Sequence, residues 1–257
     1  MNIVRGELFE KLSDNRKIFY CHTHDANKFL NNPVEGEFIL ITHNSDGMVT
    51  DNVRIENGVT YDADVNLIPK NLKRWFAQNV DVKHEKIEPI PIGLENTKWF
   101  KHINKEQKIK NIIKTTRKNK NLIYLNLNIK TNPKIRLPIY NMLKNKKYVT
   151  VEYGKNGIGF ENYLNNLYNH KFMVCPEGNG IDVHQPWESI LVGTIPIQKK
   201  NNTNLNWRDL PICWVDDWCQ LNDESFLNKE YERIKNSKYN IEKLYFEFWE
   251  RRIKSFL

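Results

Sequence analysis

Short apolar runs alternate along the chain with segments in which apolar residues recur at helical spacing. Apolar runs of strand length cover residues 17–21, 37–42, 86–94, 121–127, 148–153, 171–175, 195–198 and 210–215. Helical patterns cover residues 3–12, 26–30, 71–79, 106–118, 134–145, 160–169, 183–191, 223–235 and 240–256. Strands that alternate with helices in this way are typical of α/β proteins, and the pattern predicts that fold class.

One segment, residues 170–199, combines a strand, a glycine loop, a helix and a second strand. Its first apolar run is followed by Gly178 and Gly180. Glycine permits a positive φ and a close approach of the backbone to a ligand. Asp182 is expected to cap the helix that follows, and Gly193 is expected to end it.

The start of this helix has the residue types of a site for phosphate and sugar. Backbone N–H groups at a helix N-terminus favour phosphate binding. His184 lies in the first turn, and Glu188 follows four residues later on the same face of the helix. These residues predict a crevice that binds a diphosphate beside the loop and a ribose or sugar diol at Glu188. Spacing alone leaves a second interpretation open, a loop that only turns the chain beside a solvated glutamate.

Residues 175–197, CPEGNGIDVHQPWESILVGTIPI, resemble the donor-binding segment of exostosin-type glycosyltransferases. Members of that family commonly carry an arginine near the start of the helix, where this chain has His184 and Gln185. Two earlier stretches, WFAQN and PIPIGLENTKW, are similar to the N-terminal half of the same enzymes. The resemblance implies a GT-B-like α/β fold, in which two Rossmann-like domains face each other across a cleft and the second domain binds a nucleotide sugar.

The resemblance also implies how the chain is divided. Residues 1–118 would form an acceptor-side domain, and residues 119–257 a donor domain whose last helix packs across the junction. Arg136 resembles the basic residue near the diphosphate, with Lys130 as the second candidate. The alternative interpretation of Arg136 is an ordinary surface arginine. The expected donor-binding residues are Lys130, Arg136, Glu177, Gly178, Asn179, Gly180, Asp182, His184 and Glu188.

Carboxylates that follow two strands of the first half are the candidates for a catalytic base. Asp46 follows the run 37–42, and Glu95 follows the run 86–94. Ligands bind at the carboxyl ends of strands in open α/β sheets, so either carboxylate could take the proton of an acceptor hydroxyl. Asp46 is the first candidate, although Asp46 and Gly47 together are also an ordinary turn signal.

The expected activity is transfer of a sugar from a nucleotide sugar to a hydroxyl of a carbohydrate or glycoconjugate. Inversion at the anomeric carbon follows from the resemblance. We expect no metal and no other cofactor, because a helix dipole and basic residues can neutralise the leaving diphosphate. The alternatives are a retaining transferase or phosphorylase, and a non-catalytic basic protein that binds nucleotide sugars or nucleic acid.

Composition narrows these alternatives. The 257 residues are 40% hydrophobic and 12% aromatic, which is typical of a globular protein. The formal net charge of +8 suits an anionic ligand, but no arginine stripe or nucleic-acid motif accompanies it. The first residues lack the apolar core of a signal peptide, and no run approaches the ~18 apolar residues of a membrane span. A cytoplasmic or intracellular location is therefore expected.

Overall fold

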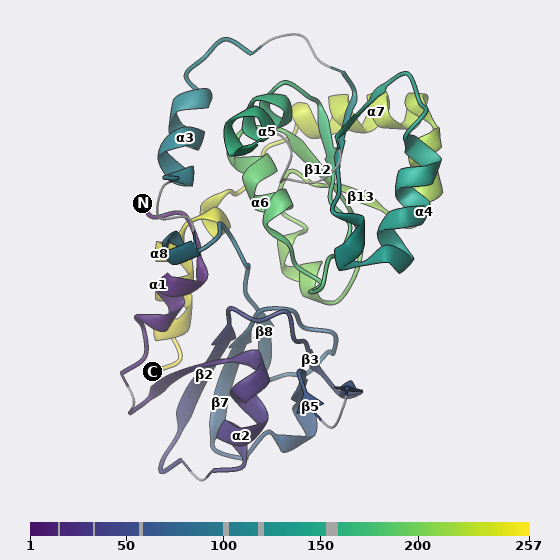
Figure 1. The fold of residues 1–257 in the computed structure, drawn as a ribbon. Helices are drawn as coiled ribbons and strands as arrows, with labels where there is room; N and C mark the ends of the chain where they lie inside the picture. Colours follow the sequence, from purple (N-terminus) through teal and green to yellow (C-terminus); the bar gives the residue numbers. More distant parts are fainter. Residues whose placement is uncertain (15, 33, 57–58, 100–102, 118–120, 153–158) are drawn as a thin grey trace.

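The computed structural model describes residues 1–14, 16–32, 34–56, 59–99, 103–117, 121–152 and 159–257. The described chain is a mixed α/β protein whose larger sheets are parallel (Figure 1). This confirms the fold class predicted from the alternation of apolar runs and helical patterns.

The first half of the described chain forms a four-stranded parallel sheet in the order β1-β2-β7-β8. Its strands are β1 (Ile18–His22), β2 (Phe38–His43), β7 (Leu72–Ala77) and β8 (Ile87–Pro89). Short strands lie beside this sheet: β3 (Val49–Thr50), β4 (Ile55–Glu56), β5 (Val59–Thr60) and β6 (Ala63–Asp64). The spatial order of the main strands follows their order along the chain.

The second half of the described chain forms a five-stranded parallel sheet in the order β10-β9-β11-β12-β13. Its strands are β9 (Ile123–Asn126), β10 (Val149–Glu152), β11 (Phe172–Val174), β12 (Ile195–Lys199) and β13 (Cys213–Val215). The chain adds β10 on one side of β9 and then β11 on the other side. The strand order therefore reverses between β9 and β11, and ligands of open α/β sheets bind at such a switch point.

Helices cover both faces of the second sheet. The helices of the described chain are α1 (Gly6–Glu10), α2 (Ala26–Leu30), α3 (Lys105–Ile112), α4 (Pro133–Leu143), α5 (Gly159–Tyr168), α6 (His184–Leu191), α7 (Glu224–Lys235) and α8 (Phe246–Lys254). Ile123 and Leu125 of β9 pack in one core with residues of α4 and α7. Tyr124 points to the opposite face and packs with residues of α5. This alternation is the period of two that a strand imposes.

The prediction of a helix at residues 71–79 is wrong, because this segment contains strand β7. Leu72, Trp75 and Phe76 match a helical spacing, but a short apolar run fits a strand equally well when both faces of the sheet are covered. Trp75 packs in the core beside α2, while its neighbour Phe76 packs in the core on the other face. A central strand needs this pair of adjacent apolar residues.

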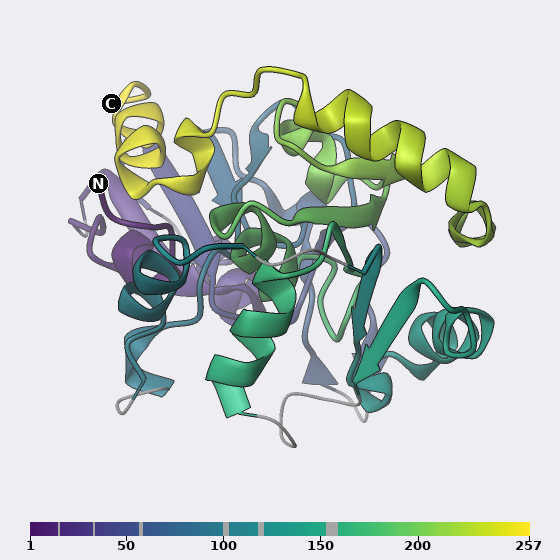
Figure 2. The same ribbon diagram turned by 90° about the horizontal axis from the view of Figure 1, so that it is seen from above.

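One hydrophobic core joins the two sheets. It contains Ile41 of β2, Trp187 of α6 and Trp249 of α8, all of them buried. Trp207 lies between the two other tryptophans, with ring centroids 5.2 Å from Trp187 and 6.1 Å from Trp249. The last helix therefore contacts residues of both halves. The two chain ends lie on the same side of the molecule (Figures 1 and 2).

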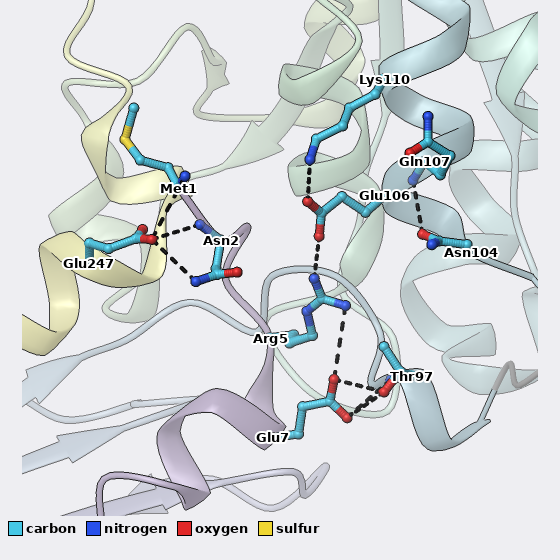
Figure 3. Close-up of polar contacts among 10 residues, drawn as sticks. All are labelled: Met1, Asn2, Arg5, Glu7, Thr97, Asn104, Glu106, Gln107, Lys110 and Glu247. Carbon is cyan, nitrogen blue, oxygen red and sulfur yellow. Dashed lines mark hydrogen bonds and ion pairs between the residues drawn. The ribbon is translucent and has the colours of Figure 1, made fainter.

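The N-terminal segment contacts both α8 and α3 (Figure 3). The amide of Asn2 donates to Glu247 of α8 at 2.8 Å. Arg5 forms ion pairs with Glu7 and with Glu106 of α3. These contacts fix the position of α3 beside the loop that follows β8.

Several elements are shorter than predicted. The pattern at 106–118 gives a helix that ends at Ile112, and the pattern at 240–256 gives a helix only from Phe246. Strand β8 covers only Ile87–Pro89 of the predicted run 86–94. Turns of 3-10 helix fill several connections: Thr23–Asp25, Val65–Leu67, Thr97–Trp99, Ile129–Thr131, Thr203–Trp207, Trp218–Asn222 and Glu242–Leu244. The predicted boundary between residues 118 and 119 lies outside the described residues.

Candidate functional site

A cavity of about 460 Å³ lies at the switch point of the second sheet. We call it the switch-point cavity. Residues that follow β9 and β11 line it together with the start of α6 and two residues of the first half. The lining residues are Asp46, Ile92, Asn126, Asn128, Lys130, Thr131, Arg136, Gly178, Asn179, Gly180, Asp182, Val183, His184 and Gln185. The structure thus brings together most of the predicted donor-binding residues and Asp46.

Arg136 is the buried cation of this cavity. Asn132 caps α4 and Pro133 begins it, so that Arg136 lies in the first turn of this helix. Its side chain donates from Nε to Glu177 O at 2.8 Å, from Nη1 to Asn128 O at 3.0 Å, and from Nη2 to Pro176 O at 3.1 Å.

The positive charge of Arg136 has no carboxylate beside it. The residue is 5% exposed and forms no ion pair within the described ranges. Burial lowers the pKa of Arg136, yet a guanidinium stays charged in proteins. A guanidinium has five N–H donors, and two remain beyond the three bonds to carbonyls. An anion in the cavity would find both charge and hydrogen-bond donors there.

The glycine loop packs against Arg136 and against Asn79. A Cβ on Gly178 would lie 3.0 Å from Arg136 Nη2, and a Cβ on Gly180 would lie 2.6 Å from Asn79 Nδ2. Neither glycine has a positive φ, unlike Gly193, which has a φ of +73° and ends α6 as predicted. Of the two properties that glycine offers, this loop therefore uses the close approach of the backbone and not a positive φ. The loop needs glycine because protein side chains approach its backbone closely.

Asp182 is not the cap of α6, because Val183 occupies that position. The Asp182 side chain is buried, accepts from the amide of Ile92 at 2.8 Å, and accepts from Trp187 Nε1 at 3.0 Å. Its own amide donates to Asn79 Oδ1 at 2.8 Å. Asp182 therefore connects the glycine loop to the first half of the chain by hydrogen bonds.

Burial raises the pKa of Asp182 from the ordinary 3.8 to about 7. Between these values the folded protein holds a proton that the unfolded chain has lost, so stability falls as the pH rises toward 7. We expect wild type to lose up to a few kcal/mol of unfolding free energy, relative to Asp182→Asn, between about pH 5 and pH 8. Urea unfolding of both proteins across this range measures the difference. If the unfolding free energies of wild type and Asp182→Asn changed in parallel with pH, Asp182 would not have a raised pKa.

His184 is the first residue of α6 and points toward the first half of the chain. Its Nδ1 lies 2.8 Å from Gly93 O. A carbonyl oxygen only accepts, so Nδ1 carries the hydrogen of this bond. His184 lines the switch-point cavity and also a neighbouring one.

This adjoining cavity has a volume of about 250 Å³. Its lining residues are Gly6, His22, His43, Asn44, Ser45, Asp46, Gln78, Ile92, Leu94, Glu95, Asn96, Lys98, Trp99 and His184. Both predicted base candidates therefore line it. Asp46 is exposed and accepts from Asn179 Nδ2 of the glycine loop at 3.2 Å. Glu95 accepts from Lys105 Nζ at 3.0 Å.

Glu188 does not line a cavity with His184, contrary to the prediction. It is 0% exposed, and it accepts from Tyr163 OH at 2.8 Å and from Lys105 Nζ at 3.3 Å. Helix α6 is buried on nearly all sides, so its glutamate contacts α3 and α5. A contact of Glu188 with a sugar diol has no support from this position.

Of the remaining predicted donor-binding residues, Lys130 lines the switch-point cavity and Glu177 does not. Lys130 is exposed on the wall of the switch-point cavity. The carbonyl of Glu177 holds Arg136, but its carboxylate accepts from Asn201 Nδ2 at 3.1 Å and does not line this cavity. Sequence reasoning missed Asn126 and Gln185, which lie at the end of β9 and in the first turn of α6. Polar residues at those two positions were the available signal.

No group of three or more His, Cys, Asp or Glu side chains in the described ranges is arranged to hold a metal ion. No described helix combines the length and the apolar character that crossing a membrane requires.

Comparison with known proteins adds no assignment. The sequence matches no known protein-family model, and it has no significant match among the curated proteins.

Proposed function

We propose that this protein is a glycosyltransferase that uses a nucleoside-diphosphate sugar as donor. The observation that carries the proposal is Arg136, a buried cation without a carboxylate partner among the described residues, on the wall of a cavity at a strand switch point. A buried charge that the protein leaves uncompensated is costly unless a ligand of opposite charge completes the site.

The diphosphate would lie between Arg136, Lys130 and the first turn of α6. Helix α6 presents its positive dipole end to the same cavity, and Lys130 adds an exposed cation at the wall. These groups would stabilise the charge that develops on the leaving diphosphate, without need of a metal ion. The resemblance to exostosin-type enzymes supports the same placement.

The acceptor would occupy the adjoining cavity. Its wall carries amides and carboxylates that can bind sugar hydroxyls, and Asp46 lies on the boundary with the donor side. Glu95 is engaged by Lys105, which makes Asp46 the stronger of the two carboxylate candidates for the base. Attack of the acceptor oxygen from this side would invert the anomeric carbon. The two halves of the chain, 1–118 and 119–257, would then act as small GT-B-like domains.

A thermal-shift panel tests the donor class, because a ligand that binds only the folded state raises the melting temperature. We expect stabilisation by one or more of UDP-, GDP- and dTDP-sugars, and less by a CMP-sugar, which lacks a diphosphate. Release of the nucleoside diphosphate then reports turnover. Binding without turnover on any acceptor would favour the non-catalytic alternative, and no stabilisation by any diphosphate would contradict the proposal.

A further inference from the structure

Trp99 is the exposed tryptophan of this protein. The chain has seven tryptophans, all within the described ranges, and the others are buried or half-buried. Trp99 is 66% exposed. An indole is usually buried, because its large apolar surface is unfavourable in water. The fold buries only a small part of this side chain, which leaves an apolar surface that a ligand could cover.

Trp99 lines the adjoining cavity, where the proposed function places the acceptor. The same wall carries planar amides and carboxylates: Asn44, Asp46, Gln78, Glu95 and Asn96. Amides and carboxylates can bind the hydroxyls of a sugar by hydrogen bonds. The face of an aromatic ring is negative, so it attracts the weakly positive C–H hydrogens of a sugar ring. A wall that combines the two suits a carbohydrate better than a wholly apolar ligand.

The turn that carries Trp99 is held in place by its neighbours. The amide of Trp99 donates to Asn96 O at 3.2 Å. Thr97 Oγ1 donates to Glu7 Oε2 at 2.8 Å (Figure 3), and the amide of Glu7 donates to Asn96 Oδ1 at 2.9 Å. Asn96 Nδ2 in turn donates to Asn44 Oδ1 at 2.8 Å. The backbone beneath the indole is therefore fixed before a ligand binds, which lowers the ordering cost of binding.

Lys98 contacts the same ring. Its Nζ lies 5.5 Å from the centroid of the Trp99 ring, a cation–π contact at an exposed position. The exposed fraction of Trp99 is that with Lys98 in place, so this contact leaves much of the indole surface accessible. Lys98 also lines the adjoining cavity, where an ammonium can donate to a sugar hydroxyl.

We propose that Trp99 is the stacking surface for the acceptor, and that the acceptor is a pyranose with a flat C–H face, such as a β-linked glucose or galactose unit. This inference deepens the proposed glycosyl transfer and rests on it. The pyranose ring lies against the indole, and its hydroxyls bind the amides and carboxylates of the cavity wall. Asp46 lines both cavities, so an acceptor bound in this way adjoins the donor side.

Lactose and cellobiose are the probes, and sorbitol is the matched control because it is a polyol without a ring. Acrylamide quenches the fluorescence of exposed tryptophans, which makes Trp99 its main target in wild type. We expect at least one of the disaccharides to reduce this quenching in the absence of any nucleotide, and sorbitol to leave it unchanged. Saturation-transfer NMR should show the strongest transfer on the C–H hydrogens of one face of the sugar ring.

Trp99→Ala should weaken binding of these disaccharides by about tenfold or more, measured by titration in saturation-transfer NMR. Its melting temperature should stay within about 2 °C of wild type, because the indole is exposed. Its affinity for UDP and GDP should change less than about twofold. Trp99→Phe keeps a smaller aromatic face and should bind with intermediate affinity. Trp218→Ala is the matched control: Trp218 is half-buried and lines neither cavity, so its loss should lower stability but not disaccharide affinity.

Two results would overturn the inference. One is that neither disaccharide protects Trp99 from acrylamide more than sorbitol does. The other is that Trp99→Ala binds the disaccharides as tightly as wild type. Disaccharide binding that depends on Trp99, in a protein that binds no nucleoside diphosphate, would support the saccharide site and overturn the proposed function.

Discussion

Replacing Lys105 by methionine is expected to lower the free energy of unfolding by about 3–5 kcal/mol, the usual cost of removing one partner of a buried ion pair. Lys105 is 6% exposed, and its ammonium donates to Glu188 at 3.3 Å and to Glu95 at 3.0 Å. Glu188 is 0% exposed, so the substitution leaves a buried carboxylate without this cation. Methionine keeps much of the volume of the lysine stem, so the experiment tests charge more than packing.

A double-mutant cycle, with unfolding in urea as the measurement, gives the coupling free energy between Lys105 and Glu188. Lys105→Met combined with Glu188→Gln should recover part of the loss, because a glutamine carries no charge that must be compensated. Lys105→Met alone should regain stability as the pH falls, since a protonated Glu188 is neutral. Lys110→Met is the control, because Lys110 pairs with Glu106 on the surface and should cost about 1 kcal/mol or less. Additive losses in the cycle would show that the charge pair is not the cause.

The sequence allowed the switch-point cavity to be predicted as a set of residues. Arg136 and the glycine loop follow β9 and β11 of the second sheet, and the carboxyl ends of parallel strands meet at one edge of a sheet. Asp46 follows β2 of the first sheet, so its place in this cavity depends on how the two halves of the chain pack together. The resemblance contributed the expectation that this edge binds phosphate.

The orientation of α6 could not be predicted in the same way. A spacing of four places His184 and Glu188 on one helix face, but it does not tell which neighbour that face meets. His184 turns toward the Gly93 carbonyl, whereas Glu188 meets Lys105 and Tyr163. Those partners come from segments far away in sequence, so no local pattern contains this information.

Asn79 shows why the contact between the halves was missed. The helical interpretation of 71–79 placed it inside a helix, but it follows strand β7 with a φ of +56°. In that conformation its amide donates to Ser45 O at 3.1 Å and accepts from the Asp182 amide at 2.8 Å. Asparagine tolerates the left-handed region better than most residues, so its position after an apolar run was the available signal.

Replacing Arg136 by glutamine is expected to weaken binding of inorganic pyrophosphate and of UDP or GDP by about 10–100-fold. The estimate follows from about 1.5–3 kcal/mol for a hydrogen bond to a charged group and 1.4 kcal/mol for each factor of ten. Pyrophosphate is the useful probe, because it carries the diphosphate without base or sugar. Isothermal titration calorimetry at low and high salt measures the change. The wild-type affinity should fall with salt, and the variant should show a weaker dependence.

Two further variants keep this test interpretable. Arg136 also holds the carbonyls of Asn128, Pro176 and Glu177, so its loss lowers stability as well as charge. Arg117→Gln is the matched control: Arg117 is a partly buried arginine that donates to Tyr168 O at 2.7 Å and does not line the switch-point cavity. It should lose stability but keep pyrophosphate affinity. Arg136→Lys keeps the charge without the planar fork and should bind pyrophosphate with intermediate affinity. Equal affinities in wild type and Arg136→Gln, with both proteins folded, would remove the observation on which the proposed donor site depends.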